Sequence, residues 1–334
     1  MKQSVVAIIL AFSLVLMLQS CSHRETYGPV VPESKLPKIT VKIHRYGKAL
    51  FSLDTLHFKE GLEKLKKNFP YFLDADLNDT ANVNQLYRYV TDTNIEKVYR
   101  QTMKVYPNLN SLERKLSSAF AHFKYYFPNY KLPQVFTYVS NLYYMHPILR
   151  RDSFLVIALD DYLGENYQPY QDLNIPDYHR RCMQQAFIPV DVMNSLYDHY
   201  FYPSIPAGNV LAKIIQAGKK LYFLDAMMPM TPDSVKIGYS AKQMQWMKKY
   251  KKDVWAVLVK NNLLYSTNYM VMNKLIQPGP FSDGFSRNSP AAMGNWFGWQ
   301  IIRKFMSRYP NTTLQQLFKM NDAQSILEKS GYKP

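Results

Sequence analysis

The stretch "SFLVIAL", residues 153–159, decides the fold class of this chain, because it is a short apolar run with the length of a buried strand. A second run, "PQVFTYV" (133–139), contains the β-branched and aromatic residues that favour strands, so we expect the two runs to pair. Residues 39–57 alternate in part between apolar and polar side chains and predict a further short strand. Together these segments predict one small sheet.

Much of the remaining chain has the spacing of helices. Phe58, Leu62, Leu65 and Phe69 fall three or four residues apart, which places them on one face of a helix. Further helix starts are predicted at Asn110 with Glu113, after Pro206, at Ser240 with Gln243 and at Ser289 with Pro290. Helix ends are predicted near Pro128, near Tyr309 and at Gly331. The sequence therefore predicts an α+β fold that is mainly α-helical with one small β-sheet.

The N-terminus has the pattern of an exported, lipid-modified chain. Lys2 precedes the apolar run Val5–Leu18, which matches a signal peptide and is short of the ~20 apolar residues of a membrane span. The sequence Leu18-Gln19-Ser20-Cys21 resembles a bacterial lipobox, in which the chain is cut before the cysteine and acyl chains such as palmitate are attached to it. Two or three such chains make a stable anchor. We therefore expect Cys21 to hold the protein at the outer membrane, facing the periplasm.

This interpretation divides the chain into three parts. Residues 1–20 are a signal peptide, residues 21–38 a proline-containing lipidated tether, and residues 39–334 a single mainly helical domain. Cys182 is the only other cysteine, so acylation of Cys21 leaves no possible intrachain disulfide.

The formal net charge of +16 favours anionic partners. Phospholipid head groups, cell-wall polymers and acidic proteins are of this kind, whereas no nucleic-acid-binding motif is present and nucleic acid is not expected. We expect contacts with the membrane and with other envelope proteins, and anionic envelope polymers are a further candidate. One segment contains a cluster of four lysines, Lys248, Lys249, Lys251 and Lys252. The cluster is either a solvated helix face or a docking patch.

Familiar catalytic motifs are missing from the sequence. No two of the seven histidines stand four apart, so the zinc motif H-E-x-x-H is absent, and neither G-x-S-x-G nor a phosphate-binding loop occurs. Asp160 and Asp161 directly follow the run at 153–159. Their function would be a cation site or an acid/base pair, and the structural alternative is a turn. Cys182 beside Arg181 is either a structural or an activated thiol. We expect neither a cofactor nor a metal.

Two further clusters allow a structural or a functional interpretation. Met227, Met228 and Met230 predict either buried packing or an adaptable contact surface. Gly294 and Gly298 stand four residues apart, which predicts that another element approaches closely there.

Four blocks of the sequence resemble the gliding-motility lipoprotein family GldB of Bacteroidetes. They are "FLVIALDDYLGENYQPY" (154–170), "GKKLYFLDAMMPMTPDSVKIGYSAKQMQWM" (218–247), "SPAAMGNWFGWQIIRKFM" (289–306) and "ILEKSGYKP" (326–334). The resemblance extends over nearly all of the chain after Cys21. It implies a role in the envelope machinery of gliding and its associated secretion system.

A more distant resemblance is to zincin-type metallopeptidases, in the order of two strands followed by two helices. In those enzymes the first helix holds H-E-x-x-H and the second a glutamate ligand; here residues 177–200 lack the motif, and Gln216 stands near the place of the glutamate. The resemblance implies a degenerate peptidase-like fold, with a relic pocket at Asp160, Asp161, His179 and Gln216. We therefore expect a non-enzymatic, lipid-anchored interaction protein. The alternatives are a hydrolase with a rearranged site and a module that binds anionic polymers.

Overall fold

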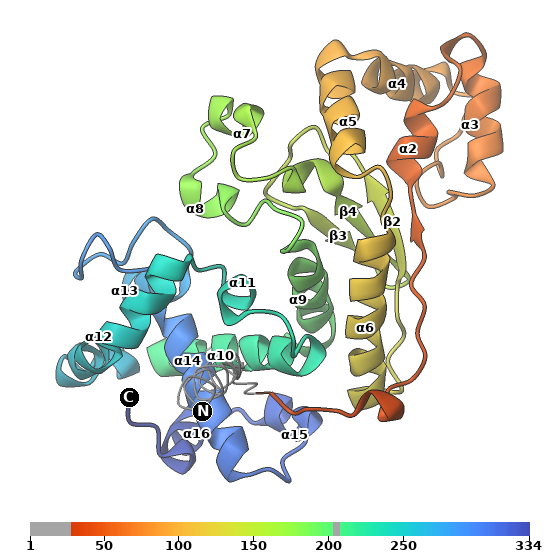
Figure 1. The fold of residues 1–334 in the computed structure, drawn as a ribbon. Helices are drawn as coiled ribbons and strands as arrows, with labels where there is room; N and C mark the ends of the chain where they lie inside the picture. The colour runs from red at the N-terminus through yellow and green to blue at the C-terminus, as the bar shows by residue number, and fades with distance from the viewer. Residues whose placement is uncertain (1–27, 203–207) are drawn as a thin grey trace, which may run out of the picture.

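The predicted sheet is present in the computed structural model, which describes residues 28–202 and 208–334 (Figure 1). Its strands are β1 (Ile43–His44), β2 (Gln134–Tyr138), β3 (Ile148–Arg150) and β4 (Phe154–Ala158), in the order β1-β2-β4-β3. β2 pairs in parallel with both β1 and β4, and β3 pairs antiparallel with β4. The chain therefore passes from β2 to the far edge of the sheet, forms β3 there and returns as β4.

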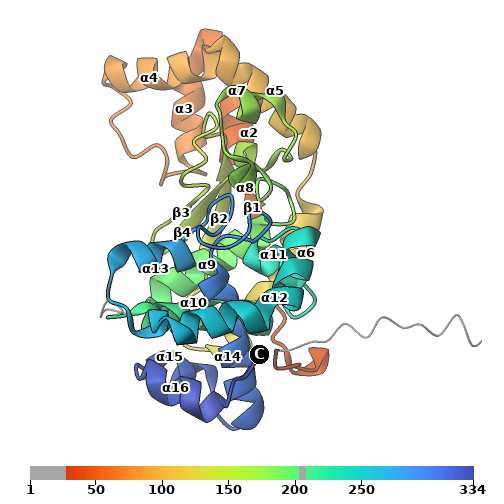
Figure 2. The ribbon, with the colours of Figure 1, turned by 90° about the vertical axis from the view of Figure 1, so that its left-hand side faces the viewer.

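Helices make up most of the described structure. Between β1 and β2 lie α2 (Tyr46–Phe51), η2 (Thr55–His57), α3 (Phe58–Lys66), α4 (Thr80–Thr91), α5 (Thr93–Val105) and α6 (Asn110–Tyr126). After β4 come η3 (Leu159–Tyr162), α7 (Gln168–Asp172), α8 (Asp177–Arg180), α9 (Ile188–Phe201), α10 (Val210–Met227), α11 (Asp233–Ile237), α12 (Ala241–Lys260), η4 (Leu263–Tyr265), α13 (Tyr269–Ile276), α14 (Met293–Arg308), α15 (Leu314–Lys319) and α16 (Ala323–Ser330). Figures 1 and 2 show α2–α5 at one end of the molecule and α10–α16 at the other, with the sheet between them. The mainly helical α+β prediction is confirmed.

Alternate residues of the central strands face two different hydrophobic clusters, as the two-residue period of a strand requires. Val135, Leu155 and Ile157 pack into the larger cluster, which includes residues of α6, α9, α10 and α14. Phe136 and Val156 pack on the opposite face, against residues of α2 and α3. The sheet therefore separates the two cores, and the predicted apolar face of α3 is buried in the smaller one.

A close contact between α10 and α14 organises the larger core. A Cβ atom built on Gly298 would lie 1.8 Å from the backbone oxygen of Ile214, and one built on Gly218 would lie 2.2 Å from the backbone of Gly298. The two helix backbones touch where these glycines meet, because no side chain separates them. This confirms the prediction that another element approaches closely at Gly298.

The segment before β1 runs beside α6 (Figure 1). The backbone N–H of Val41 donates to the hydroxyl of Ser117 at 2.9 Å, and that of Ile43 donates to the carboxylate of Glu113 at 2.9 Å. This segment contains one short turn, η1 (Glu33–Lys35), and its first described residue, Gly28, lies against the end of α10. A Cβ on Gly28 would be 2.7 Å from the backbone oxygen of Asp225.

Three predicted helix starts are confirmed, because α6 begins at Asn110, α10 begins at Val210 and α12 begins after Ser240; the start at Ser289 and the capping box at Asn110 are wrong. The helix at Asn110 has no side-chain cap, because Glu113 accepts its hydrogen bond from the distant Ile43 instead of from the helix start. α14 begins at Met293, and Ser289 is buried in the preceding loop, where its hydroxyl bonds to Ser282. The box of Ser240 and Gln243 is present as predicted at the start of α12.

The remaining predicted element boundaries agree closely with the structure. α6 ends at Tyr126, α14 ends at Arg308, and Gly331 ends α16 in the left-handed conformation that glycine favours. The strand predicted within residues 39–57 is short, because it ends at His44 and a helix that buries Tyr46 and Leu50 follows.

The predicted signal peptide and Cys21 lie outside the described residues. Within 28–202 and 208–334, none of the helices combines the length and the apolar character that a membrane crossing demands.

Candidate functional site

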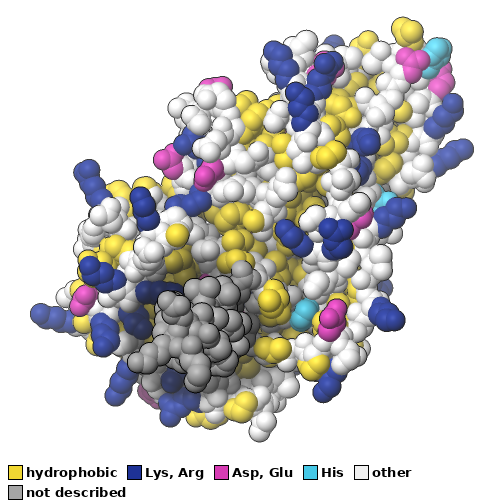
Figure 3. Space-filling view, viewed as in Figure 1, with side chains coloured by type: hydrophobic (Ala, Val, Ile, Leu, Met, Phe, Trp, Pro, Cys, Tyr) yellow, Lys and Arg dark blue, Asp and Glu magenta, His cyan; other side chains and the backbone are white. Residues whose placement is uncertain are grey.

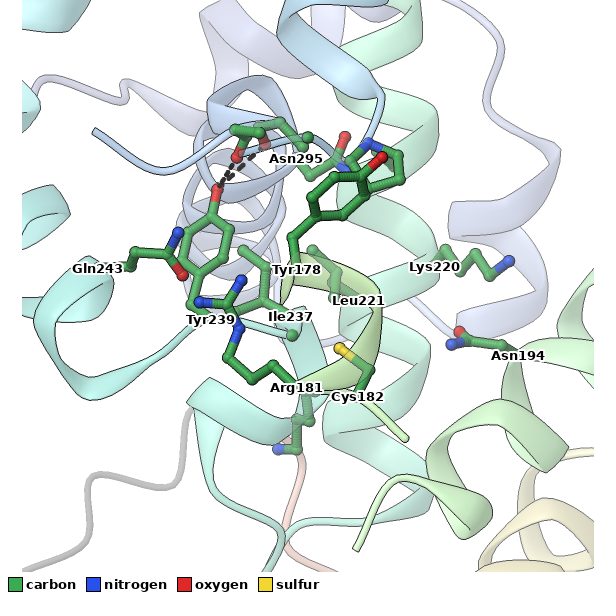
Figure 4. A pocket seen from close by; sticks show the side chains of 17 residues that line it. Tyr178, Arg181, Cys182, Asn194, Lys220, Leu221, Ile237, Tyr239, Gln243 and Asn295 are labelled. Atoms are coloured by element: carbon green, nitrogen blue, oxygen red, sulfur yellow. Dashed lines mark hydrogen bonds between the residues drawn. The ribbon is translucent and has the colours of Figure 1, made fainter. Parts of the chain in front are cut away.

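A cavity of about 430 Å³ lies where α8, α9, α10 and α11 meet the starts of α12 and α14 (Figure 4). Ligand pockets in proteins generally occupy about 300–1,000 Å³, so the cavity is large enough for a small organic molecule. Its polar lining consists of Tyr178, Arg181, Asn194, Lys220, Lys236, Tyr239, Gln243 and Asn295. Its apolar lining includes Ala217, Leu221, Ile237, Pro278, Ala291 and Ala292.

The charged residues that line the cavity are all basic. Lys236 is buried and donates to Asp225 at 2.8 Å, and Lys220 pairs with the half-exposed Asp198 at 2.7 Å. Arg181, the third cation, has no hydrogen bond or ion pair to its guanidinium among the described residues. Figure 4 shows its side chain extending toward Tyr239 and Gln243, with Lys220 and Asn194 on the other side of the cavity.

Two buried polar atoms of the lining have no hydrogen-bond partner in the described structure. They are Nε of Arg181, a donor, and Oδ1 of Asn295, an acceptor. The amide nitrogen of Asn295 donates to the backbone oxygen of Ile276 at 3.1 Å, which fixes the orientation of that side chain. A buried polar group without a partner is destabilising by about 1–3 kcal/mol, so both atoms favour a ligand that would satisfy them.

The wall of the cavity is held in place by its own hydrogen bonds. The hydroxyl of Tyr239 lies 2.8 Å from the backbone oxygen of Ala291 and 3.2 Å from that of Ala292, to which it donates (Figure 4). Gln243 is fixed in the capping box of α12 with Ser240. The cavity therefore exists without a ligand to shape it.

A buried ionic network lies behind the cavity and joins α10, α11 and α14. Asp225 accepts hydrogen bonds from Lys236, from Trp299 Nε1 at 2.7 Å and from Arg303 Nε at 2.7 Å. Arg303 also donates two hydrogen bonds to Asp233, at 2.8 and 2.9 Å, and its guanidinium lies 3.7 Å from the ring of Trp299. Two acids and two bases balance in charge, which makes the burial of the group tolerable.

The predicted acidic pair lies elsewhere, just after β4. Asp160 and Asp161 are 0 % and 1 % exposed and belong to η3. Backbone N–H groups of Ser140 and Leu142 each donate to Asp160 at 2.7 Å, and the Ser140 hydroxyl lies 3.0 Å from Asp160 and 3.3 Å from Asp161. The hydrogen bonds of Asp160 support the turn interpretation.

The two carboxyl groups differ in their environment. Burial raises the pKa of Asp160, and the donors of Ser140 and Leu142 oppose that shift by stabilising its charge. Asp161 has an Oδ1 atom without a partner in the described structure, and burial together with the charge of Asp160 raises the pKa of Asp161 to about 8. The backbone donors make Asp160 the better placed of the two carboxyl groups to carry a negative charge.

We expect the substitution Asp161→Asn to stabilise the protein at alkaline pH. The raised pKa means that the folded state binds the Asp161 proton more tightly than the unfolded state, so stability is lost as the pH rises from about 4 to about 8. Asparagine does not ionise, so at pH 8.5 the variant should gain about 1–3 kcal/mol in the free energy of unfolding. Urea unfolding at several pH values measures the difference, with the exposed Glu165→Gln as the control. A difference from wild type that does not change between pH 5 and pH 8.5 would contradict the assignment.

The other residues of the predicted relic pocket are on separate elements. His179 belongs to α8, where its ring contacts Tyr144 and Tyr178 and burial lowers the pKa of its imidazole. Gln216 is half-buried on α10. No hydrogen bond or ion pair in the described structure joins either residue to Asp160 or Asp161, and none of the four lines the 430 Å³ cavity. The predicted single helix within 177–200 is two helices, α8 and α9.

The thiol of Cys182 lies in the lining of the cavity. Burial and the nearby charge of Asp191 raise its pKa to about 12, and the charge of Arg181 only partly opposes them. A thiol with this pKa stays protonated, which supports the structural interpretation of Cys182. No group of three or more His, Cys, Asp or Glu side chains in the described ranges is placed to hold a metal ion.

The methionine cluster divides between core and surface. Met227 is buried in the larger core, whereas Met230 is 68 % exposed. Both residues line a second cavity, of about 340 Å³, together with Met228 and with His122 of α6. Met227 therefore supports the interpretation as buried packing, whereas a contact surface at the exposed Met230 stays a prediction.

Sequence reasoning missed most of the 430 Å³ cavity. Its lining comes from segments between Tyr178 and Asn295, and no local pattern joins them. The only local signal is Arg181 beside Cys182, and it indicates an effect on the thiol and not a cavity. Asn295 stands between Gly294 and Gly298 of α14, a spacing that predicts packing and no binding role.

A family model described as "Gliding motility protein GldB" matches residues 29–334. The match starts one residue after the first described residue and continues to the end of the chain, so it includes the sheet, the acidic pair and the cavity. No curated protein and no solved structure matches the chain.

Proposed function

The chain belongs to the gliding motility protein GldB family, and on this premise we propose that it is a lipid-anchored, non-enzymatic interaction protein of the cell envelope. Membership of the family makes it a gliding-motility-associated protein. The anchor, the absence of catalysis and the side of the membrane are proposals that rest on the features below.

The observation that carries the proposed anchor is the sequence Leu18-Gln19-Ser20-Cys21 after a short apolar run. An acylated Cys21 would hold the folded body at the outer membrane, and two or three chains would make that attachment stable. Export to the periplasmic face agrees with the expected signal peptide at residues 1–20.

The non-enzymatic assignment is supported by the positions of the acidic residues. A hydrolase would need its acid and base within reach of a substrate. Asp160 and Asp161 are instead buried, and Asp160 is bound by the backbone of the loop at Ser140 and Leu142. His179 and Gln216, the other residues of the rival hydrolase site, stand on different helices.

The surface supports an interaction role. Lys and Arg side chains are spread over the face in Figure 3 and gather over α12 at its lower left. The exposed lysines of α12 include Lys242, Lys248, Lys249, Lys252 and Lys260. Basic surfaces attract acidic partners and accelerate their association, so acidic envelope proteins are the partners we propose, while anionic envelope polymers stay a prediction from the net charge.

Replacing Cys21 with serine tests the proposal. We expect Cys21→Ser to move the protein from the membrane fraction to the soluble periplasmic fraction, because the acyl chains supply the membrane affinity. The control Cys182→Ser removes the only other thiol and should leave the protein in the membrane fraction. Fractionation followed by crosslinking in intact cells measures both location and partners. A Cys21→Ser protein that stays in membranes after a high-salt wash and keeps its crosslinks would overturn the anchor.

A further inference from the structure

We propose that the 430 Å³ cavity binds a small anionic organic ligand that carries a carboxylate or phosphate group together with a hydrogen-bond donor. The inference does not depend on the lipid anchor or on a particular protein partner. It rests on the charge of the lining, on two polar atoms without partners and on the apolar remainder of the wall.

The charge of the lining selects an anion. Arg181, Lys220 and Lys236 line the cavity, and no Asp or Glu does. Lys236 is committed to Asp225 and Lys220 to Asp198, whereas the guanidinium of Arg181 has no acidic partner in the described structure. A guanidinium presents its donors in a planar fork that matches a carboxylate or phosphate, so Arg181 is the residue that would bind the anionic group.

The two unsatisfied atoms define the rest of the ligand. Nε of Arg181 needs an acceptor, which the anionic group supplies. Oδ1 of Asn295 needs a donor, such as a hydroxyl or an amide N–H; the neighbouring backbone oxygen of Ile276 is itself an acceptor and is bound by the Asn295 amide nitrogen. A ligand with both groups would satisfy both atoms, whereas a bare anion would satisfy only one.

The apolar wall indicates an organic ligand. Leu221, Ile237 and Ala291 present carbon atoms to the cavity between the polar residues. Pockets of this composition use a few polar groups for orientation and apolar contact for affinity. The ligand is therefore a compact molecule with a carbon framework.

The experiment measures binding of three defined probes to the full-length protein in detergent by isothermal titration calorimetry. N-acetylglycine carries a carboxylate and an amide N–H, glycerol 1-phosphate carries a phosphate and hydroxyls, and N-acetylglycinamide is the neutral control. We expect saturable binding of at least one anionic probe, about tenfold or more tighter than the neutral probe. The stronger of the two anionic probes identifies carboxylate or phosphate as the preferred group.

Matched variants locate the site. Arg181→Gln should weaken the binding of the better probe about tenfold or more, and Asn295→Leu about threefold or more, because each removes one partner. Arg180→Gln removes the same charge one residue away, where Arg180 pairs with the exposed Asp177 outside the cavity, and should leave the affinity unchanged. Circular dichroism of each variant confirms that it is folded.

Two results would overturn the inference. One is the absence of saturable binding of both anionic probes to the wild-type protein. The other is equal loss of affinity in Arg180→Gln and Arg181→Gln, which would assign the binding to general surface charge. If Arg181→Gln does not fold, Arg181→Lys replaces it, because lysine keeps the charge but lacks the fork and should still weaken binding.

Discussion

Replacing Gly298 with alanine should lower the free energy of unfolding by about 3 kcal/mol or more, because α10 and α14 would be forced apart. The new methyl group would lie 1.8 Å from the backbone oxygen of Ile214 and 2.7 Å from its carbonyl carbon. Both atoms belong to a helix backbone and cannot rotate away as a side chain can. The gain of about 1 kcal/mol in helix propensity from glycine to alanine is smaller than this loss. Urea unfolding followed by circular dichroism measures the change.

Gly61→Ala is the matched control for this prediction. Gly61 lies within α3, and a Cβ there would meet only the side chain of Leu53, with the nearest carbon at 3.1 Å. That side chain can move by a few tenths of an ångström, so the stability should change by less than about 1 kcal/mol in either direction. If Gly298→Ala is as stable as Gly61→Ala, the backbones of α10 and α14 do not touch at this point.

Asp225→Ala should be the most destabilising single change in the ionic network, with an expected loss of about 3–5 kcal/mol. The substitution removes the acceptor of Lys236, whose side chain is 3 % exposed, and of the indole N–H of Trp299. Arg303 keeps its two bonds to Asp233, so the main loss comes from the buried lysine that has no remaining acid. The same unfolding assay measures it.

The control for the network is Asp198→Ala. Asp198 pairs with Lys220 at 2.7 Å, but the two side chains are 47 % and 31 % exposed. Water replaces the lost partner at such a site, so the expected loss is below about 1 kcal/mol. A loss in Asp225→Ala no larger than in Asp198→Ala would mean that the network contributes no more than a surface ion pair.

Local sequence patterns predicted the elements of this fold better than their arrangement. The strand at 153–159 and the apolar face of α3 follow from periodicity, which depends only on neighbouring residues. The parallel pairing of β2 and β4 cannot be predicted from periodicity, because it depends on where the chain places β3. The capping box expected at Asn110 is absent for a similar reason, because Glu113 accepts a hydrogen bond from Ile43, a residue far away in the sequence.

The candidate site shows the same limit more strongly. Asp160 and Asp161 were noticed because they are adjacent, but their role in a turn depends on Ser140, twenty positions earlier. Arg181 and Asn295 could not be joined from the sequence, since neither has a motif and they meet only through the packing of α8 and α14 around one cavity. The ionic network of α10, α11 and α14 was not predicted, because its members lie on three helices and Arg303 is 78 residues away from Asp225 in the sequence.

The position of Gly28 against the end of α10 limits how far the protein can stand from a bilayer. If Cys21 is embedded through its lipid, the intervening stretch has a contour length of only about 25 Å, compared with about 60 Å if everything up to Lys38 were free to extend. With such an anchor, Gly28 and the end of α10 would lie within about 25 Å of the bilayer surface, so this end of the folded body would be the one nearest the lipid.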